Sequence, residues 1–471
     1  MNSRSTSIHD NVSDNENARA FLDYFRCPQE FAPFRLAGQL SSSEGFFSFR
    51  GIPCFGRTVA GAPEVAKNDS RSPFLPEAEI SIFCDPTEVV DNLRRERYVA
   101  RARSQKVLRN LYYSLRPALP FAVRKFLQKT LFKLRNHSFP NWPVDCSVEQ
   151  IFELLMKMSV EAAGQEVPFI WFWPDGKNCA AMMTHDVEEQ SGVQACEMLM
   201  DLDDSFGIKT AFQVIPEGRY AGVEHLIQHI RARGFEANIH DLDHDGRLYD
   251  HIERFRERAK KINEYAKKYG LHGFRAGAMH RNQEWFCMLD FEYEMSVPAA
   301  SHLEPQRGGC CTVMPYFVGD VLELPLTTVQ DYGLFYILEE MSIDLWKRQC
   351  EIISAHHGLM SFIIHPDYIV QRVERELYCE LLRHLSCLKE ERDVWLAVPS
   401  EINRWWRERK QMRLRRTSEG WCIEGIGSER ARLAFASVVN GRLRYRLAGQ
   451  SETAWAAEGI STEETASRAH I

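Results

Sequence analysis

Residues 179–188 read CAAMMTHDVE, and this stretch decides both the fold and the chemistry expected of the chain. The apolar run that ends at Thr184 has the length and composition of a buried strand. Two carboxylates, Asp186 and Glu188, follow it with one residue between them. Because a buried charge without a partner is costly, carboxylates at the end of such a strand indicate a functional site.

The chain from residue 168 to about residue 405 repeats this pattern. We expect strands at residues 179–184, 210–215, 236–240, 273–276, 293–297, 321–326, 359–365 and 394–398. We expect amphipathic helices at residues 193–206, 223–233, 248–269, 336–356 and 371–390. Strands that alternate with helices imply an α/β fold with a parallel sheet, and about eight of them suggest a barrel. The active groups of such barrels lie where the strands end, and the residues found there are His185, Asp186, His240, Arg275 and His365.

The chain continues on both sides of this barrel. With 471 residues it is long enough for two or three units. We expect a disordered tail at 1–20 and an N-terminal accessory region at 21–145, made of short strands and then a helical stretch at 86–135. The barrel would span 165–405, and a small β appendage at 411–450 and a loose tail at 451–471 would follow it.

The composition is that of a globular protein, with 44% hydrophobic and 26% charged residues. A net charge of −7 disfavours a nucleic-acid-binding protein, which needs a concentrated basic face. No run of about 18 apolar residues is present, so we expect no transmembrane span. The first residues lack the basic-then-apolar pattern of a signal peptide, and the 13 cysteines are irregularly spaced. These features favour reduced thiols and a cytoplasmic location.

His240 and His244 are four residues apart and follow the strand-like run FEANI. On a helical turn after that strand, the two imidazoles would share one face. A catalytic divalent ion needs about three protein ligands and an open position for water. We therefore expect this pair to bind a metal ion; the alternative is that both histidines are surface or hydrogen-bonded residues.

Asp186 and Glu188 are the acidic partners of such a site. In a strand their side chains point to the same side, so one carboxylate can bind the metal ion while the other accepts a proton from water. The alternative is that both cap the helix expected near Ser191. The run DLDHDG at 241–246 opens like a calcium-binding loop, but its twelfth position, Ile252, lacks the required carboxylate. We expect its aspartates to orient the histidines or to cap the next helix.

Arg275 and His365 end two further apolar runs. A guanidinium beside a carboxylate lowers the pKa of that carboxyl group, so Arg275 could hold Asp186 ionised; a surface arginine is the alternative. His365 precedes Pro366, which ends the strand. A histidine in that position suits a general acid, although a buried structural histidine would give the same pattern.

Taken in order, five motifs resemble those of the polysaccharide deacetylase (NodB-homology, carbohydrate esterase) family. They are MTHDVE at 183–188, H-x-x-x-H at 240–244, GFR at 273–275, ELP at 323–325 and IHP at 364–366. The resemblance covers residues 170–400 and implies a distorted (β/α) barrel. It also implies one divalent metal ion, usually Zn2+, with Co2+, Mn2+ or Ni2+ as alternatives. The implied reaction removes acetyl groups from N-acetylated sugars by attack of a water held on the metal.

The resemblance implies a role for each site residue as well. The metal ligands would be Glu188, His240 and His244, the base Asp186, the partner of the base Arg275, and the acid His365. Glu323 or a neighbour would orient His365. Two motifs depart from the usual family pattern: Asp-Asp-Gly is here Asp-Val-Glu, and Arg-x-Pro-Tyr is here Arg-Ala-Gly-Ala. The second departure implies a different wall of the substrate groove.

The sequence therefore predicts a metal-dependent hydrolase acting on carbon–nitrogen bonds other than peptide bonds, with an N-acetylated sugar or glycan as its substrate. Two alternatives stay open. One is a hydrolase of a non-sugar amide, and the other is a catalytically silent glycan- or partner-binding protein with the same barrel. A homo-oligomer also stays open.

Overall fold

Strand β6 (Cys179–Val187) pairs with three neighbours in a nine-stranded sheet of the computed structural model, which describes residues 16–61, 80–99, 130, 139–300, 303 and 306–450. The other strands are β7 (Ala211–Val214), β8 (Glu236–His240), β9 (Gly273–Arg275), β10 (Tyr293–Glu294), β11 (Tyr316–Val318), β12 (Val321–Glu323), β13 (Leu359–Ile364) and β14 (Val394–Leu396). Eight of them follow the order β11-β12-β10-β9-β8-β7-β6-β13. The pairing of β11 with β12 is antiparallel, and the other pairings of these strands are parallel.

The sheet curls into a distorted (β/α) barrel, as the sequence predicted. Strand β13 pairs with β6 along one edge, from residue 180 to residue 185. On the other edge, β14 pairs with the start of β6 and β7 with its end. One long strand thus joins three neighbours, and its pairing with β7 extends it to Val187, beyond the predicted strand at 179–184.

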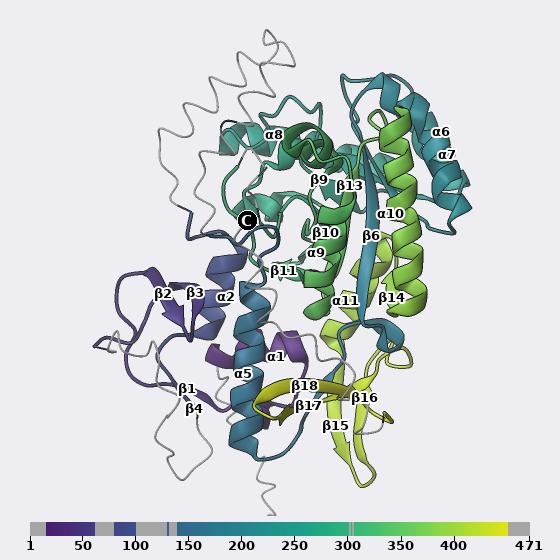
Figure 1. Cartoon of the computed structure of the whole chain (residues 1–471). Helices are drawn as coiled ribbons and strands as arrows, with labels where there is room; N and C mark the ends of the chain where they lie inside the picture. Colours follow the sequence, from purple (N-terminus) through teal and green to yellow (C-terminus); the bar gives the residue numbers. More distant parts are fainter. Residues whose placement is uncertain are drawn as a thin grey trace, which may run out of the picture.

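Five helices belong to the barrel, and Figure 1 shows α10 running alongside β6. Their bounds are α6 (Gln190–Ser205), α7 (Val223–Ala232), α8 (Ile252–Tyr269), α9 (Asp344–Ala355) and α10 (Arg372–Glu391). The helix predicted at 336–356 begins later than expected. A π-helical turn at Tyr332–Leu338 comes first, and it is separated from α9 by non-helical residues. Such turns are rare and often lie at functional sites.

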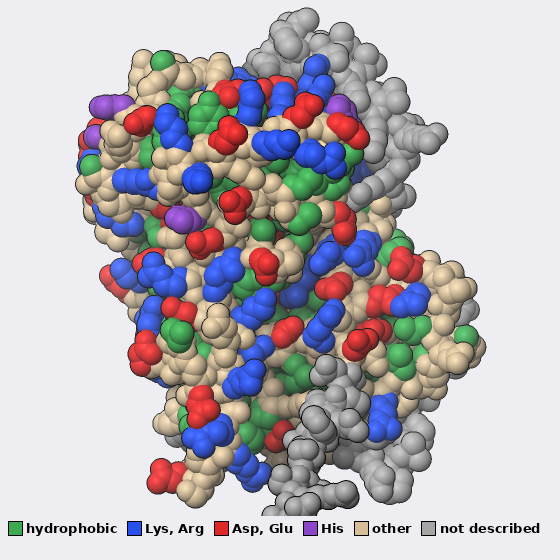
Figure 2. All heavy atoms as spheres, turned by 180° about the vertical axis from the view of Figure 1, so that it is seen from behind, with side chains coloured by type: hydrophobic (Ala, Val, Ile, Leu, Met, Phe, Trp, Pro, Cys, Tyr) green, Lys and Arg blue, Asp and Glu red, His purple; other side chains and the backbone are tan. Residues whose placement is uncertain are grey.

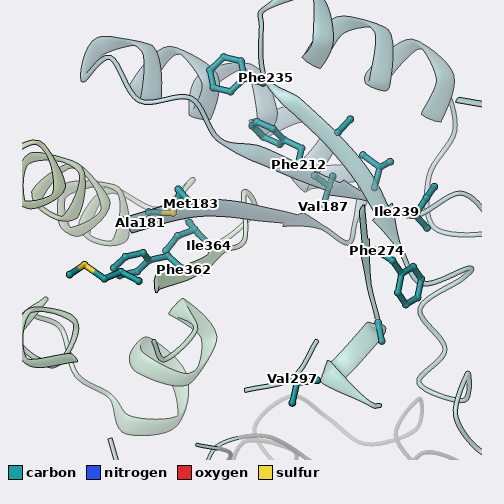
Figure 3. Packing of buried hydrophobic residues seen from close by; sticks show 14 of the residues in the cluster. Ala181, Met183, Val187, Phe212, Phe235, Ile239, Phe274, Val297, Phe362 and Ile364 are labelled. Carbon is teal, nitrogen blue, oxygen red and sulfur yellow. The ribbon is translucent and has the colours of Figure 1, made fainter. Parts of the chain in front are cut away.

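The two faces of β6 pack against different cores. Ala181 and Met183 belong to the core between the sheet and its helices, where Phe212 and Phe362 also pack (Figure 3). Residues of even number, such as Met182, belong to a second core shared with the flanking regions. Because side chains alternate along a strand, both faces of β6 are buried, and the strand is apolar up to Met183.

The N-terminal region lies against the barrel and contains helices α1 (Arg19–Phe25), α2 (Pro86–Arg94) and α5 (Ser147–Ala163). Its short strands are β1 (Phe34–Leu36), β2 (Gly45–Phe49), β3 (Ile52–Gly56) and β4 (Ile80–Ile82). Residues 16–20, which the sequence assigned to a disordered tail, are folded here: Ala18 is buried, and the Ala20 N–H donates to Thr87. The rest of that predicted tail, most of the helical stretch expected at 86–135 and the tail at 451–471 lie outside the described residues.

The C-terminal part consists of α11 (Pro399–Gln411) and the strands β15 (Arg413–Thr417), β16 (Gly420–Glu424), β17 (Leu433–Val439) and β18 (Arg442–Leu447). Strand β17 pairs with β5 (Val167–Ile170), which precedes the barrel. Figure 1 shows these yellow strands beside the lower end of α5. The predicted β appendage is therefore connected to the start of the barrel domain through one three-stranded sheet.

Three general features agree with the composition. Within the described residues, no helix is both long and apolar enough to cross a bilayer. All 13 cysteines are free, and most of them, including the adjacent pair Cys310 and Cys311, are buried. Over the face shown in Figure 2, basic and acidic side chains are intermixed.

Candidate metal centre and active site

Glu188, His240 and His244 bring three potential metal-ligand atoms together. These atoms all lie within 4.8 Å of one another. Oε1 of Glu188 is 3.0 Å from Nε2 of His244 and 3.6 Å from Nε2 of His240. One carboxylate and two imidazoles form a donor set that suits zinc and leaves an open position on the ion. Residues from two different strands thus converge as the sequence predicted.

The loop after β8 differs from the predicted helical turn. His240 is the last residue of the strand, and Asp241 and His244 both have positive φ, 57° and 54°. Asp241 fixes this backbone, because its carboxylate accepts hydrogen bonds from the N–H groups of Leu242 (2.7 Å) and Gly277 (3.3 Å). A helix needs negative φ throughout, so the two histidines meet through a tight loop.

The two imidazoles fit a metal ion. Nε2 of His240 and Nε2 of His244 are both buried and face Oε1 of Glu188, and within the described part of the chain neither makes a hydrogen bond of regular geometry. On the other side of the first ring, Nδ1 of His240 lies 3.2 Å from the carbonyl oxygen of Arg275. That contact selects the tautomer with a free lone pair on Nε2. Because a buried nitrogen without a partner is costly, a divalent cation between the rings would stabilise both.

Asp186 lies beside this ligand set and is paired with Arg275. Nη1 of Arg275 donates to Oδ1 of Asp186 at 2.6 Å and to Oγ1 of Thr184 at 2.8 Å. Oδ2 of Asp186 is 3.8 Å from Nε2 of His240. Burial raises the pKa of Asp186, but the guanidinium of Arg275, with His240 and His365, lowers that pKa below its usual value overall. Asp186 is therefore an ionised carboxylate next to the ligands, as expected for a base.

His365 faces the same ligand set from the end of β13. Its Nε2 is 3.5 Å from Oε1 of Glu188. Burial lowers the pKa of His365, but Asp331 and Glu188 raise it well above its ordinary value. A protonated imidazole directed toward the ligands has the position and charge of a general acid.

The sequence prediction that Glu323 orients His365 is wrong. Asp331 does so, accepting hydrogen bonds of 2.7 Å from both Nδ1 and the backbone N–H of His365. Glu323 instead accepts a hydrogen bond from the N–H of Val297 and is fully buried beside Glu294 on the next strand. Burial and the neighbouring Glu294 raise the pKa of Glu323 well above its usual value.

His185 also ends a predicted strand but points away from the ligands. As an odd-numbered residue of β6 it faces the helix side, where its Nε2 is 3.1 Å from Asp203 and its ring lies beside Tyr378. All three side chains are buried. His185 is therefore part of a polar network behind the site.

Besides Asp331, the sequence prediction also missed Arg219. It follows β7, and its guanidinium donates to Glu189 at 2.7 Å and to the carbonyl oxygen of His244 at 2.8 Å. It therefore links the segment that carries Glu188 to the segment that carries His244. No local pattern marks Arg219, because a lone arginine in a loop is ordinary. Asp331 has a weak signal, as an acidic residue before an aromatic run.

The alternatives considered for the acidic residues do not match the contacts. The residue that precedes α6 is Glu189, and it makes no side-chain capping hydrogen bond. The helix α8 is capped by His251, while Asp243 and Asp245 both pair with Arg258. Only Asp241, through the backbone contacts described above, supports a metal-site histidine.

The curled sheet and the helices that follow its strands form a distorted (β/α) barrel. Among solved structures, a protein assigned as a polysaccharide deacetylase from Mycobacterium smegmatis is similar over 50% of this chain and 93% of its own, with 21% identity and a TM-score of 0.41. Puue allantoinase is similar over 50% and 92%, with 15% identity and a TM-score of 0.41. A probable polysaccharide deacetylase from Pseudomonas aeruginosa PAO1 is similar over 50% and 92%, with 14% identity and a TM-score of 0.41. The sequence matches no family model and no curated protein. At these identities the likeness concerns the barrel fold alone.

Proposed function

We propose that this protein is a metal-dependent hydrolase that removes N-acetyl groups from a glycan or a glycan precursor. One observation carries the proposal: a carboxylate–imidazole–imidazole ligand set has a carboxylate paired with an arginine on one flank and an imidazole paired with an aspartate on another. Amide hydrolysis needs these three elements, since water must lose a proton, the carbonyl must be polarised and the amine must gain a proton.

Glu188, His240 and His244 would hold the cation, and the donor set favours Zn2+ over harder ions. A bound divalent cation supplies Lewis acidity, which lowers the pKa of a water molecule and polarises the amide carbonyl. Two protein contacts orient the ligands. The Arg275 carbonyl holds the ring of His240, and Arg219 holds the backbone of His244.

Asp186 accepts the proton of the attacking water. Its Oδ1 is engaged by Arg275 while Oδ2 faces the ligand set. The low pKa that Arg275 imposes keeps the carboxylate ionised near neutral pH, so it is available as a base. Arg275 holds the carboxylate in one orientation and takes no part in the proton transfer.

His365 donates the proton that the leaving amine requires when the carbon–nitrogen bond breaks. Asp331 fixes the ring so that Nε2 faces the site, and its charge keeps the ring protonated. The products are acetic acid, which keeps the second proton of the water and releases it to solvent as acetate, and a free amine. Asp186 gains one proton and His365 loses one, so passage of one proton from Asp186 to His365 restores the starting state.

A silent binding protein is the less favoured candidate, because a binding function needs neither a base held by arginine nor an acid held by aspartate.

The 13 free cysteines support a reducing compartment and therefore a cytoplasmic precursor as the substrate.

The test is acetate release from a panel of N-acetylated sugars and oligosaccharides by protein loaded with zinc, cobalt or manganese. Release from at least one sugar, lost on removal of the metal, supports the proposal. Hydrolysis of non-sugar amides alone would redirect it to another substrate class. Metal binding without any hydrolysis would favour the silent protein.

A further inference from the structure

The N-terminal region reaches the wall of the proposed active site. We infer that Glu96 is a positioning residue: through Arg281 it holds loop 276–282, which packs against the metal ligand His244. The inference rests on the proposed function for its catalytic consequence. It gives the N-terminal region a role in the reaction.

The contact is a buried, two-pronged ion pair. Nε of Arg281 donates to Oε2 of Glu96 at 2.9 Å, and its Nη2 donates to Oε1. Both side chains are almost fully buried, and the residues are 185 positions apart in the chain. Parallel hydrogen bonds of this kind fix the guanidinium in orientation as well as in distance.

The same guanidinium of Arg281 also binds the backbone of the loop. Its Nη1 donates to the carbonyl oxygen of Met279 at 3.0 Å. Next to the loop, the side chain of Gln283 donates to the carbonyl oxygen of Arg94, at the end of α2. The N-terminal region therefore contacts the loop through the side chain of Glu96. It contacts the adjoining turn through the backbone carbonyl of Arg94.

The loop packs directly on the metal site at Gly277. A Cβ at this position would lie 2.8 Å from Cδ2 and 3.2 Å from Nε2 of His244, and 2.6 Å from Oδ2 of Asp241. The backbone of Gly277 thus covers one side of the imidazole. This is the stretch where the sequence departs from the family pattern and where a different substrate wall was expected.

The loop needs an external hold because two of its residues are strained. Ala278 and Met279 both have a φ of 53°. Residues with a Cβ rarely adopt this conformation, and it persists only where surrounding contacts enforce it. Burial of Met279 with Leu326 and Ile363 supplies one contact, and the guanidinium of Arg281 supplies a second. Gln306 adds hydrogen bonds to both backbone groups of Arg281.

The experiment compares Glu96→Gln and the double variant E96Q/R281M with the wild type and with Glu284→Gln. Glu284 forms an exposed ion pair with Arg95 and Arg97, between the same two regions but off the loop. The double variant avoids an unpaired buried charge, so it reports on the loop even if Glu96→Gln folds poorly. Backbone amide exchange is measured without metal, and zinc affinity is measured by competition with a chelator.

We expect faster exchange confined to residues 277–282 in both Glu96 variants, about tenfold weaker zinc binding and a raised KM for the amide substrate. Glu284→Gln should match the wild type. Unchanged exchange and zinc affinity in both Glu96 variants would overturn the inference while leaving the proposed function intact, as would a uniform rise in exchange over the whole barrel. A wild type that binds no zinc and releases no acetate defeats the proposed function instead, and the exchange data still decide whether Glu96 holds the loop.

Discussion

Asp331 accepts two hydrogen bonds from His365, one from Nδ1 and one from the backbone N–H, each 2.7 Å long. The carboxylate has an acceptor oxygen for each donor. An asparagine has only one, so Asp331→Asn must turn its NH2 group toward one of them. We expect kcat to fall roughly a hundredfold or more, the range lost with a general acid, while zinc affinity stays unchanged. Steady-state kinetics and a zinc titration check both parts, and full activity of this variant would remove His365 from the role of acid.

Asp186→Asn removes the proposed base but keeps its shape. The amide cannot accept a proton from water, so we expect turnover to fall by about a hundredfold or more. Zinc should remain bound, because Asp186 is outside the ligand set. Acetate release measured beside metal content separates the two effects. Activity close to wild type would show that another group takes the proton.

The stability of the protein should depend on pH through His356 and Glu153, away from the metal site. Nδ1 of His356 is 2.7 Å from Oε1 of Glu153. Burial lowers the pKa of His356, but Glu153 raises it above its ordinary value overall. A raised histidine pKa means that this pair stabilises the fold fully below about pH 6.5 and that the contribution is lost as pH rises through the folded-state pKa.

Urea unfolding at a series of pH values tests this sign. The free energy of unfolding of the wild type, minus that of His356→Gln, should decrease as pH rises from slightly acidic to alkaline values. In a Glu153→Gln background this difference should change little with pH, because the charge that raises the pKa of His356 is removed. A wild type whose advantage grows with pH would contradict the assignment.

Arg409 of α11 connects three parts of the chain, and among the residues that the structure describes no acidic side chain forms an ion pair with it. It is buried and donates to the backbone carbonyls of Tyr24, Ile170 and Trp171. Arg409→Met leaves these three acceptors unsatisfied, and each buried unsatisfied group costs about 1–3 kcal/mol. We expect a loss of about 3 kcal/mol or more in the free energy of unfolding.

The matched variant Arg409→Lys keeps the charge but lacks the forked donors, so it should recover only part of the loss. Urea unfolding of the two variants gives the comparison. Equal stability of Arg409→Met and the wild type would show that these carbonyls find other donors.

The sequence predicted the barrel well because its strands are short, apolar runs that end in polar residues. The strand predicted at 236–240 has the bounds of β8, and Asp186, Glu188, His240, His244, Arg275 and His365 lie together in the structure. Strand order brings the ends of neighbouring parallel strands to one edge, so local patterns were enough for this part.

Contacts between distant segments could not be predicted in the same way. The helical turn expected at His240 fails because Asp241 adopts positive φ and binds two backbone N–H groups, which spacing does not reveal. Asp331 begins a π-helical turn and belongs to none of the five motifs, so the resemblance pointed to Glu323 instead. The Glu96–Arg281 pair has no local signature at all, because its partners come from separate regions.

The most direct test of the central claim is a zinc titration of the metal-free protein, with the stoichiometry and affinity measured for the wild type and for variants of each ligand. We expect one zinc ion per chain in the wild type and in Asp186→Asn. We expect a severe loss of zinc binding in Glu188→Ala, His240→Ala and His244→Ala, each of which removes one of the three ligand atoms. Wild-type affinity retained in any two of these three variants would contradict the account, because the ion would then be bound elsewhere.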